Sequence, residues 1–220
     1  SQTFQALQKE LAATYTTISL DLPGFGQTQP PESVWGLNDY AEFIGSFIKK
    51  LEQKPYVIVA HSNGGAIAIR GLAEGKLQAE KLVLLASAGI RSEYKGRKLF
   101  LRLAAKGAKA LTKPLPQATQ QKLKKRAYKT IGSDLFVAEH LQETFKNVVT
   151  DDVQNDARQL SLPTLLLYGQ NDTATPPRFG ELFKAAITGA QLNVLPGAGH
   201  FVHHDKPVEV AKAVQEFLHG

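Results

Sequence analysis

The chain contains no cysteine and no methionine among its 220 residues. The lack of cysteine excludes disulfide bonds, thiolate metal sites and cysteine nucleophiles. No apolar run approaches the roughly 20 residues that cross a bilayer, and no secretory leader is visible, so we expect a cytoplasmic protein. The length and the 43% hydrophobic content suit one folded domain with a sizeable core.

Acidic residues are nearly missing from one part of the chain. Residues 91–130 hold 13 lysines and arginines but a single acid, Glu93. On a helix through 95–113, a series of cations recurs every three or four positions, namely Lys98, Arg102, Lys106, Lys109 and Lys113. This predicts an amphipathic helix with a cationic stripe. We interpret these cations as the solvated face of a lid, with weak contact to an anionic membrane surface as the alternative. Aromatic residues are few there and nucleic-acid motifs are lacking, so no nucleic-acid partner is expected.

Short apolar runs alternate with helical patterns over most of the sequence. Runs typical of strands cover 15–23, 55–62, 81–89, 163–169 and 190–197, and helical patterns cover 4–13, 37–53, 64–75, 177–188 and 206–220. This alternation predicts an α/β fold with a mostly parallel sheet and helices on both faces. Residues 91–150 show helical patterns without a strand. We therefore expect a core of residues 1–90 and 151–220 and a helical, basic cap insertion at 91–150.

The stretch VIVAHSNGG, residues 57–65, joins a predicted strand to a predicted helix through Ser62. A sharp strand-to-helix turn would hold this serine in a strained backbone conformation, and side chains two positions before and after it would collide. Ala60 and Gly64 are suitably small. The hydroxyl would project beyond the carboxyl end of the sheet, and the backbone N–H of Asn63 could face a developing oxyanion.

A nucleophilic serine needs a general base and an orienting carboxylate. Asp172 follows the apolar run 163–169, and His200 lies in a glycine-flanked loop after the run 190–197. Both therefore fall at the carboxyl ends of predicted strands, at the same edge as Ser62. His61 is expected to pack rather than to act in catalysis, because neighbouring residues on a strand point to opposite faces. His203 and His204 are expected in solvated or capping roles, and no residue spacing suggests a metal site.

Four segments, DLPGFGQT (21–28), AHSNGG (60–65), GQNDTATPP (169–177) and GAGHFVHHDKP (197–207), resemble the α/β-hydrolase superfamily. The resemblance is strongest to small esterase-like members with a helical cap. It implies Ser62 as nucleophile, His200 as base and acid, and Asp172 as the orienting carboxylate. It implies no cofactor.

The sequence departs from that family at its start. The family's second oxyanion donor comes from an H-G loop after the third strand, and no such loop precedes the helix predicted at 4–13. We therefore expect the first three strands of the usual fold to be lacking. The strands at 15–23 and 57–61 would then have to pair directly or leave backbone groups unpaired.

These observations favour a serine hydrolase of the carboxylesterase type acting on a small-molecule ester through an acyl-enzyme. Carbon–carbon bond hydrolases, lactonases, aminopeptidases and thioesterases share the same triad and remain alternatives. A non-catalytic ligand-binding protein of this fold is the alternative from another class.

Overall fold

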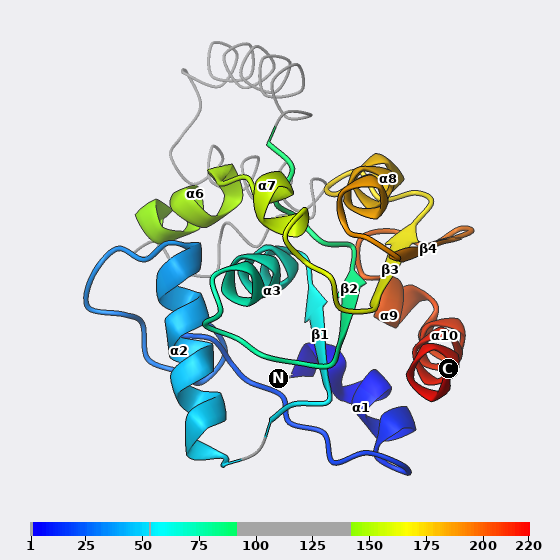
Figure 1. The fold of residues 1–220 in the computed structure, drawn as a ribbon, viewed down its shortest axis with the longest axis horizontal. Helices are drawn as coiled ribbons and strands as arrows, with labels where there is room; N and C mark the ends of the chain where they lie inside the picture. The colour runs from blue at the N-terminus through cyan, green and yellow to red at the C-terminus, as the bar shows by residue number, and fades with distance from the viewer. Residues whose placement is uncertain (1, 53, 92–141) are drawn as a thin grey trace, which may run out of the picture.

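The computed structural model describes residues 2–52, 54–91 and 142–220, and four of the five predicted strands are confirmed in it. They are β1 (Val57–His61), β2 (Lys81–Leu85), β3 (Thr164–Gly169) and β4 (Gln191–Leu195). All neighbouring pairs run parallel in the order β1-β2-β3-β4. The fold class is therefore confirmed as α/β with a parallel sheet (Figure 1).

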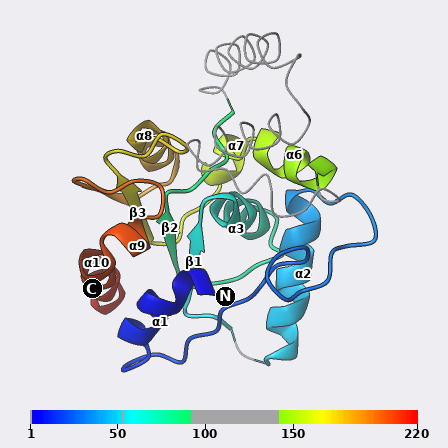
Figure 2. The same cartoon turned by 180° about the vertical axis from the view of Figure 1, so that it is seen from behind.

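Helices connect the strands and cover both faces of the sheet (Figures 1 and 2). The longer ones are α1 (Gln5–Leu11), α2 (Leu37–Lys50), α3 (Asn63–Ala73), α6 (Gln142–Thr150), α8 (Pro177–Ala186) and α10 (Pro207–His219). Shorter turns are η1 (Gln2–Phe4), α7 (Gln154–Ala157) and α9 (Val202–Asp205). None of the helices in these described segments is both long and apolar enough to span a membrane.

The central strands β2 and β3 are buried on both faces, as their continuous apolar sequences predict. Leu82 and Leu84 belong to the core shared with α2, α3 and α8, whereas Val83 and Leu85 belong to the core shared with α1 and α10. Successive side chains on a strand point to opposite faces, so each apolar strand supplies two cores. Both views in Figures 1 and 2 place α1 beside α10, with which it packs.

The prediction of a strand at 15–23 is wrong. Residues 16–22 have no strand conformation, and Ile18 is 57% exposed. A strand requires a hydrogen-bonded neighbour. Within the described part of the chain, β1 pairs on one side only, with β2, and forms no ladder with residues 16–22. Of the two arrangements anticipated for these segments, the structure adopts the one without direct pairing.

Both ends of the predicted cap insertion meet above the carboxyl end of β2. The backbone N–H of Arg91 donates to Asp152 Oδ2 at 2.7 Å, and the N–H of Val153 donates to the Gly89 carbonyl at 2.9 Å. Arg70 on α3 holds the returning segment by donating from Nε to Asp156 Oδ2 at 2.7 Å. Residues 92–141 lie outside the described residues, so the cap itself and its cationic stripe stay predictions.

Candidate active site

Ser62 occupies a sharp turn between β1 and α3. Its φ of 54° and ψ of −122° place a non-glycine residue in the left-handed half of backbone space, which costs on the order of 1–3 kcal/mol. The predicted strained turn is therefore present. A methyl group built at Gly64 would lie 4.0 Å from the Ala60 Cβ, so these two positions face each other across the turn as expected.

Gly65 has even less space than Gly64, although sequence reasoning did not single it out. A Cβ at Gly65 would lie 2.2 Å from Ser87 Oγ and 2.7 Å from Ser87 Cβ. This glycine lets α3 begin directly against the segment that follows β2. A side chain at this position would push the start of α3 away from Ser87.

His200 approaches Ser62 from the loop between β4 and α9. The Ser62 hydroxyl donates to His200 Nε2 across 3.0 Å, although 138 residues separate them in the sequence. The loop is held by a hydrogen bond of 2.7 Å from the Gly199 N–H to Asp205 Oδ2. The two residues meet because parallel strands present their carboxyl ends at one edge of the sheet.

Asp172 completes the hydrogen-bond chain from the loop after β3. His200 Nδ1–H donates to Asp172 Oδ2 at 2.8 Å, while Asp172 Oδ1 accepts from the backbone N–H groups of Ala174 at 2.7 Å and Thr175 at 3.0 Å. Burial raises the pKa of Asp172, but the hydrogen bond and charge of His200 and the hydrogen bonds of Thr175 bring the pKa below its ordinary value. The carboxyl group is thus ionised at neutral pH and keeps the His200 proton on Nδ1.

The loops carrying Asp172 and His200 pack directly on each other. The Asn171 N–H donates to the Ala198 carbonyl at 2.8 Å. A Cβ at Gly169, the last residue of β3, would lie only 2.1 Å from the Gly199 carbonyl oxygen. Glycine at this strand end permits the close approach that puts the carboxylate within reach of the imidazole.

His61 packs against the site, as expected, and also supports it. Burial and the rings of His200 and His203 lower the pKa of His61 to about 3, so its imidazole is neutral at physiological pH. Its Nε2–H donates to the backbone carbonyl of His200 at 3.0 Å. The sequence placed His61 beside the nucleophile but gave no sign of this contact with the His200 loop.

His203 is buried rather than solvated, which corrects the expectation from the sequence. Its side chain is 1% exposed and stacks on Phe4 with ring centroids 5.1 Å apart. Neither ring nitrogen has a hydrogen-bond partner among the described residues, and the nearby Thr3 carbonyl accepts from His204 Nε2 at 2.7 Å instead. Sequence reasoning missed the four-residue helix α9, which turns His203 toward the core.

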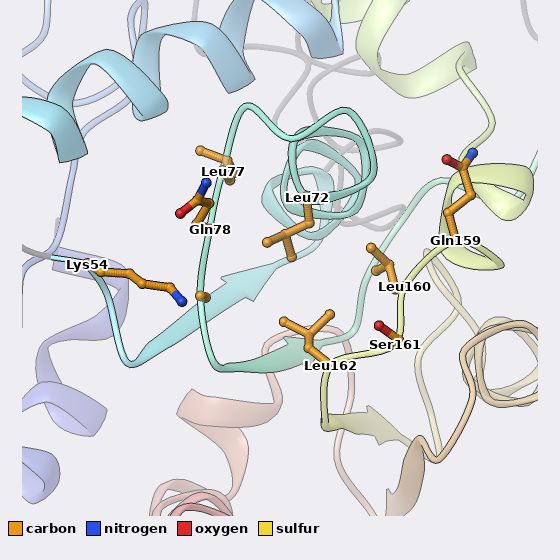
Figure 3. Close-up of a pocket in the computed structure, with 9 residues that line it drawn as sticks. Lys54, Leu72, Leu77, Gln78, Gln159, Leu160, Ser161 and Leu162 are labelled. Atoms are coloured by element: carbon orange, nitrogen blue, oxygen red, sulfur yellow. The ribbon is translucent and has the colours of Figure 1, made fainter.

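A pocket of about 250 Å³ lies away from these residues, at the amino ends of β1, β2 and β3 (Figure 3). Leu72, Leu77 and Leu162 are among the side chains that line it, and Lys54 approaches its edge. Ser62, Asp172 and His200 lie at the opposite, carboxyl edge of the sheet. This pocket is therefore separate from the site at Ser62. In the three described segments, no cluster of three or more His, Asp or Glu side chains could hold a metal ion.

A family model described as the alpha/beta hydrolase family matches residues 1–213. The chain belongs to this family. An uncharacterized protein of Mycobacterium tuberculosis is 25% identical over 244 residues, covering 99% of this chain and 72% of the relative. An uncharacterized hydrolase of Bacillus subtilis is 22% identical and covers 93% of this chain and 80% of the relative.

Solved structures of an esterase and of another hydrolase share the fold of this family member. An esterase from Exiguobacterium antarcticum superposes with a TM-score of 0.74 and 19% identity, covering 100% of this chain and 87% of that one. A meta-cleavage product hydrolase from Pseudomonas fluorescens gives 0.73 and 20%, with 99% and 85% covered. At these identities the likeness establishes the fold, and the resemblance seen in the four sequence segments is confirmed at the level of the family.

Proposed function

We propose that this alpha/beta hydrolase is a serine esterase that cleaves a small carboxylic ester. The observation that carries the proposal is the continuous hydrogen-bond chain from Ser62 Oγ through the His200 imidazole to Asp172 Oδ2, at 3.0 and 2.8 Å. This order of hydroxyl, imidazole and carboxylate is what an activated serine requires. The strained backbone at Ser62 holds the hydroxyl at the edge where the three loops converge.

In the first half of the proposed reaction, Ser62 Oγ attacks the ester carbonyl carbon while His200 Nε2 takes the hydroxyl proton. Asp172 stabilises the resulting imidazolium through Nδ1. Asn63 begins α3, where the first N–H groups of a helix lack acceptors within the helix, so its N–H is placed to donate to the developing oxyanion. Collapse of the intermediate returns the proton from Nε2 to the departing alcohol and leaves Ser62 acylated.

In the second half, water attacks the acyl carbon and gives a proton to His200 Nε2. The tetrahedral intermediate then releases the carboxylic acid, and the proton returns to Ser62 Oγ. The chain needs no added cofactor for these steps, because every proton moves between Ser62, His200 and the substrate or water. We assign choice of substrate to the cap insertion at 91–150, in keeping with its expected place over the site.

The first test is intact mass after incubation with a fluorophosphonate, followed by turnover of a short-chain nitrophenyl ester. We expect one adduct on the parent and none on Ser62→Ala. Ser161→Ala is the matched control, because Ser161 is an exposed serine at the opposite edge of the sheet, and it should react like the parent. An unlabelled but folded parent would contradict the proposal and favour a binding protein.

Labelling without ester turnover would still indicate an activated serine, but the substrate would then belong to another class. The same triad can cleave lactones, thioesters, amino-terminal peptide bonds and carbon–carbon bonds next to a carbonyl. A panel of one substrate from each of these classes, assayed with the parent and Ser62→Ala, then decides among them. Hydrolysis of any one at a rate that Ser62→Ala abolishes identifies the class.

A further inference from the structure

We propose that Thr175 is a positioning residue whose hydroxyl fixes the Asp172 carboxylate against His200. This inference rests on the proposed function, because it assigns a role within the same triad. Thr175 is 2% exposed and lies in the loop between Asp172 and α8. Its burial keeps it from substrate, so any effect on the reaction is exerted through Asp172.

The Thr175 hydroxyl stands among three polar atoms. Its Oγ1 lies 2.7 Å from Asp172 Oδ2, 2.9 Å from the Ala86 carbonyl oxygen and 3.1 Å from His200 Nδ1. The Ala86 carbonyl and the ionised Asp172 carboxylate can only accept hydrogen bonds, whereas His200 Nδ1–H donates one. The single hydroxyl proton therefore has two acceptors to choose between.

Donation to Asp172 is the better use of that proton. An O–H bonded to a carboxylate at 2.7 Å has the length of a charge-assisted hydrogen bond. If the proton pointed to Ala86 instead, lone pairs of Oγ1 would face the charged Oδ2 across 2.7 Å, whereas donation to Oδ2 leaves them facing only the neutral Ala86 carbonyl across 2.9 Å. With the hydroxyl proton directed at Oδ2, the Thr175 oxygen can also accept weakly from His200 Nδ1–H.

Residues 174 and 175 thus hold both oxygens of the carboxylate. The backbone N–H groups of Ala174 and Thr175 donate to Oδ1, and the Thr175 hydroxyl donates to Oδ2, which is the oxygen that His200 contacts. Without the hydroxyl, only His200 contacts Oδ2, while the two backbone N–H groups still hold Oδ1. The carboxylate can then pivot about Oδ1, which varies the distance between Oδ2 and Nδ1.

Thr175 also lies where the ends of β2 and β3 meet. Ala86, whose carbonyl is 2.9 Å from the hydroxyl, follows β2, and its N–H donates to the Leu167 carbonyl of β3 at 2.8 Å. Two residues later, the Ala88 N–H donates to the Ser62 carbonyl at 3.0 Å. Residues 86–88 therefore contact both the Thr175 hydroxyl beside Asp172 and the backbone of Ser62.

The hydroxyl favours the ionised form of Asp172, because it donates to the charged carboxylate. The other titratable groups that face this carboxylate are His200, His61 from β1 and Tyr168 from β3. None of these side chains is itself replaced in the isosteric variant Thr175→Val, and the hydroxyl lies closer to Oδ2, at 2.7 Å, than to His200 Nδ1, at 3.1 Å. A change in the Asp172 titration therefore reports the lost hydroxyl bond.

The test compares Thr175→Val with Thr175→Ser and with Thr173→Val, the matched control on an exposed threonine two residues away. We expect Thr175→Val to lower kcat roughly 10- to 100-fold, the range for losing a hydrogen bond to a charged group, with KM changed less than about twofold. Thr175→Ser should recover most of kcat, and Thr173→Val should match the parent. If the valine variant does not fold, Thr175→Ala removes the hydroxyl with a smaller side chain.

The second readout does not require activity. In a carbon-13 NMR titration, the Asp172 carboxyl should protonate at higher pH in Thr175→Val than in the parent and in Thr173→Val. An unchanged titration overturns the inference even if kcat falls, because a purely structural role would lower kcat alone. A shifted titration with full kcat in an active parent also overturns it. If the parent neither labels nor turns over, the proposed function fails, and the titration alone still decides whether Thr175 holds the carboxylate.

Discussion

Replacing Asp172 with asparagine tests the geometry of the site most directly. Asp172 Oδ1 accepts two backbone N–H groups, from Ala174 and Thr175. An asparagine must keep its carbonyl oxygen there, because an amide NH₂ would face two other donors. The NH₂ group is thereby forced into the position of Oδ2, opposite His200 Nδ1.

A donor at that position changes the tautomer of the His200 imidazole. Nδ1 must become the acceptor, so the proton moves to Nε2, which lies 3.0 Å from Ser62 Oγ. Nε2 can then no longer take the serine proton. The wrong tautomer at such a site costs roughly 10⁴-fold in kcat, or about 5.4 kcal/mol at about 1.36 kcal/mol for each factor of ten.

The assay is steady-state hydrolysis of the best ester, with Ser62→Ala as the floor and a urea unfolding curve as the check on folding. Nitrogen-15 NMR of His200 identifies which ring nitrogen carries the proton. We expect the Asp172→Asn variant to fold and to show the proton on Nε2. An asparagine variant that keeps more than about a tenth of the parent kcat, or keeps the proton on Nδ1, would refute the reasoning, since a loss of roughly 10⁴ is expected.

Two further predictions concern stability. Burial lowers the pKa of His203 from 6.5 to about 4, so the folded state binds fewer protons than the unfolded state and loses stability as pH falls from about 6.5 toward 4. His203→Phe should remove this loss and the cost of two unpaired nitrogens, adding about 1–3 kcal/mol at pH 5; urea unfolding at pH 7 and 5 checks it, and an unchanged pH dependence would contradict it. Gly65→Ala should destabilise the fold by about 1–3 kcal/mol through its clash with Ser87. Gly64→Ala, whose methyl has room, is the control and should cost less; equal losses in urea unfolding would show that the clash is relieved.

The sequence predicted the repeating part of the fold because that part depends on local patterns. The runs at 57–60, 82–85 and 165–168 are apolar without interruption, which is typical of strands covered on both faces. The strand expected at 15–23 failed for a nonlocal reason. Its residues have strand character, but a ladder needs a neighbour, and that neighbour is not determined by the segment itself.

The three triad residues were predictable for a related reason. Each follows an apolar run, and parallel strands place their carboxyl ends at one edge, so the order of Ser62, Asp172 and His200 in the chain already implied that they meet. Their roles as catalytic groups remain a proposal that the labelling experiment tests. Family membership, in contrast, is established by the match over residues 1–213.

The parallel sheet, the strained turn at Ser62 and the three loops that carry the triad could be predicted from the sequence, because apolar runs, small residues beside the serine and polar residues after each run are visible along the chain. Which groups support these residues became evident only in the folded structure. The contact of Thr175 with Asp172, the hydrogen bond from His61 to the His200 carbonyl and the burial of His203 each join elements that come together only after the sheet forms. Such contacts depend on distances of a few tenths of an ångström between packed loops, and no pattern along a single chain specifies those distances.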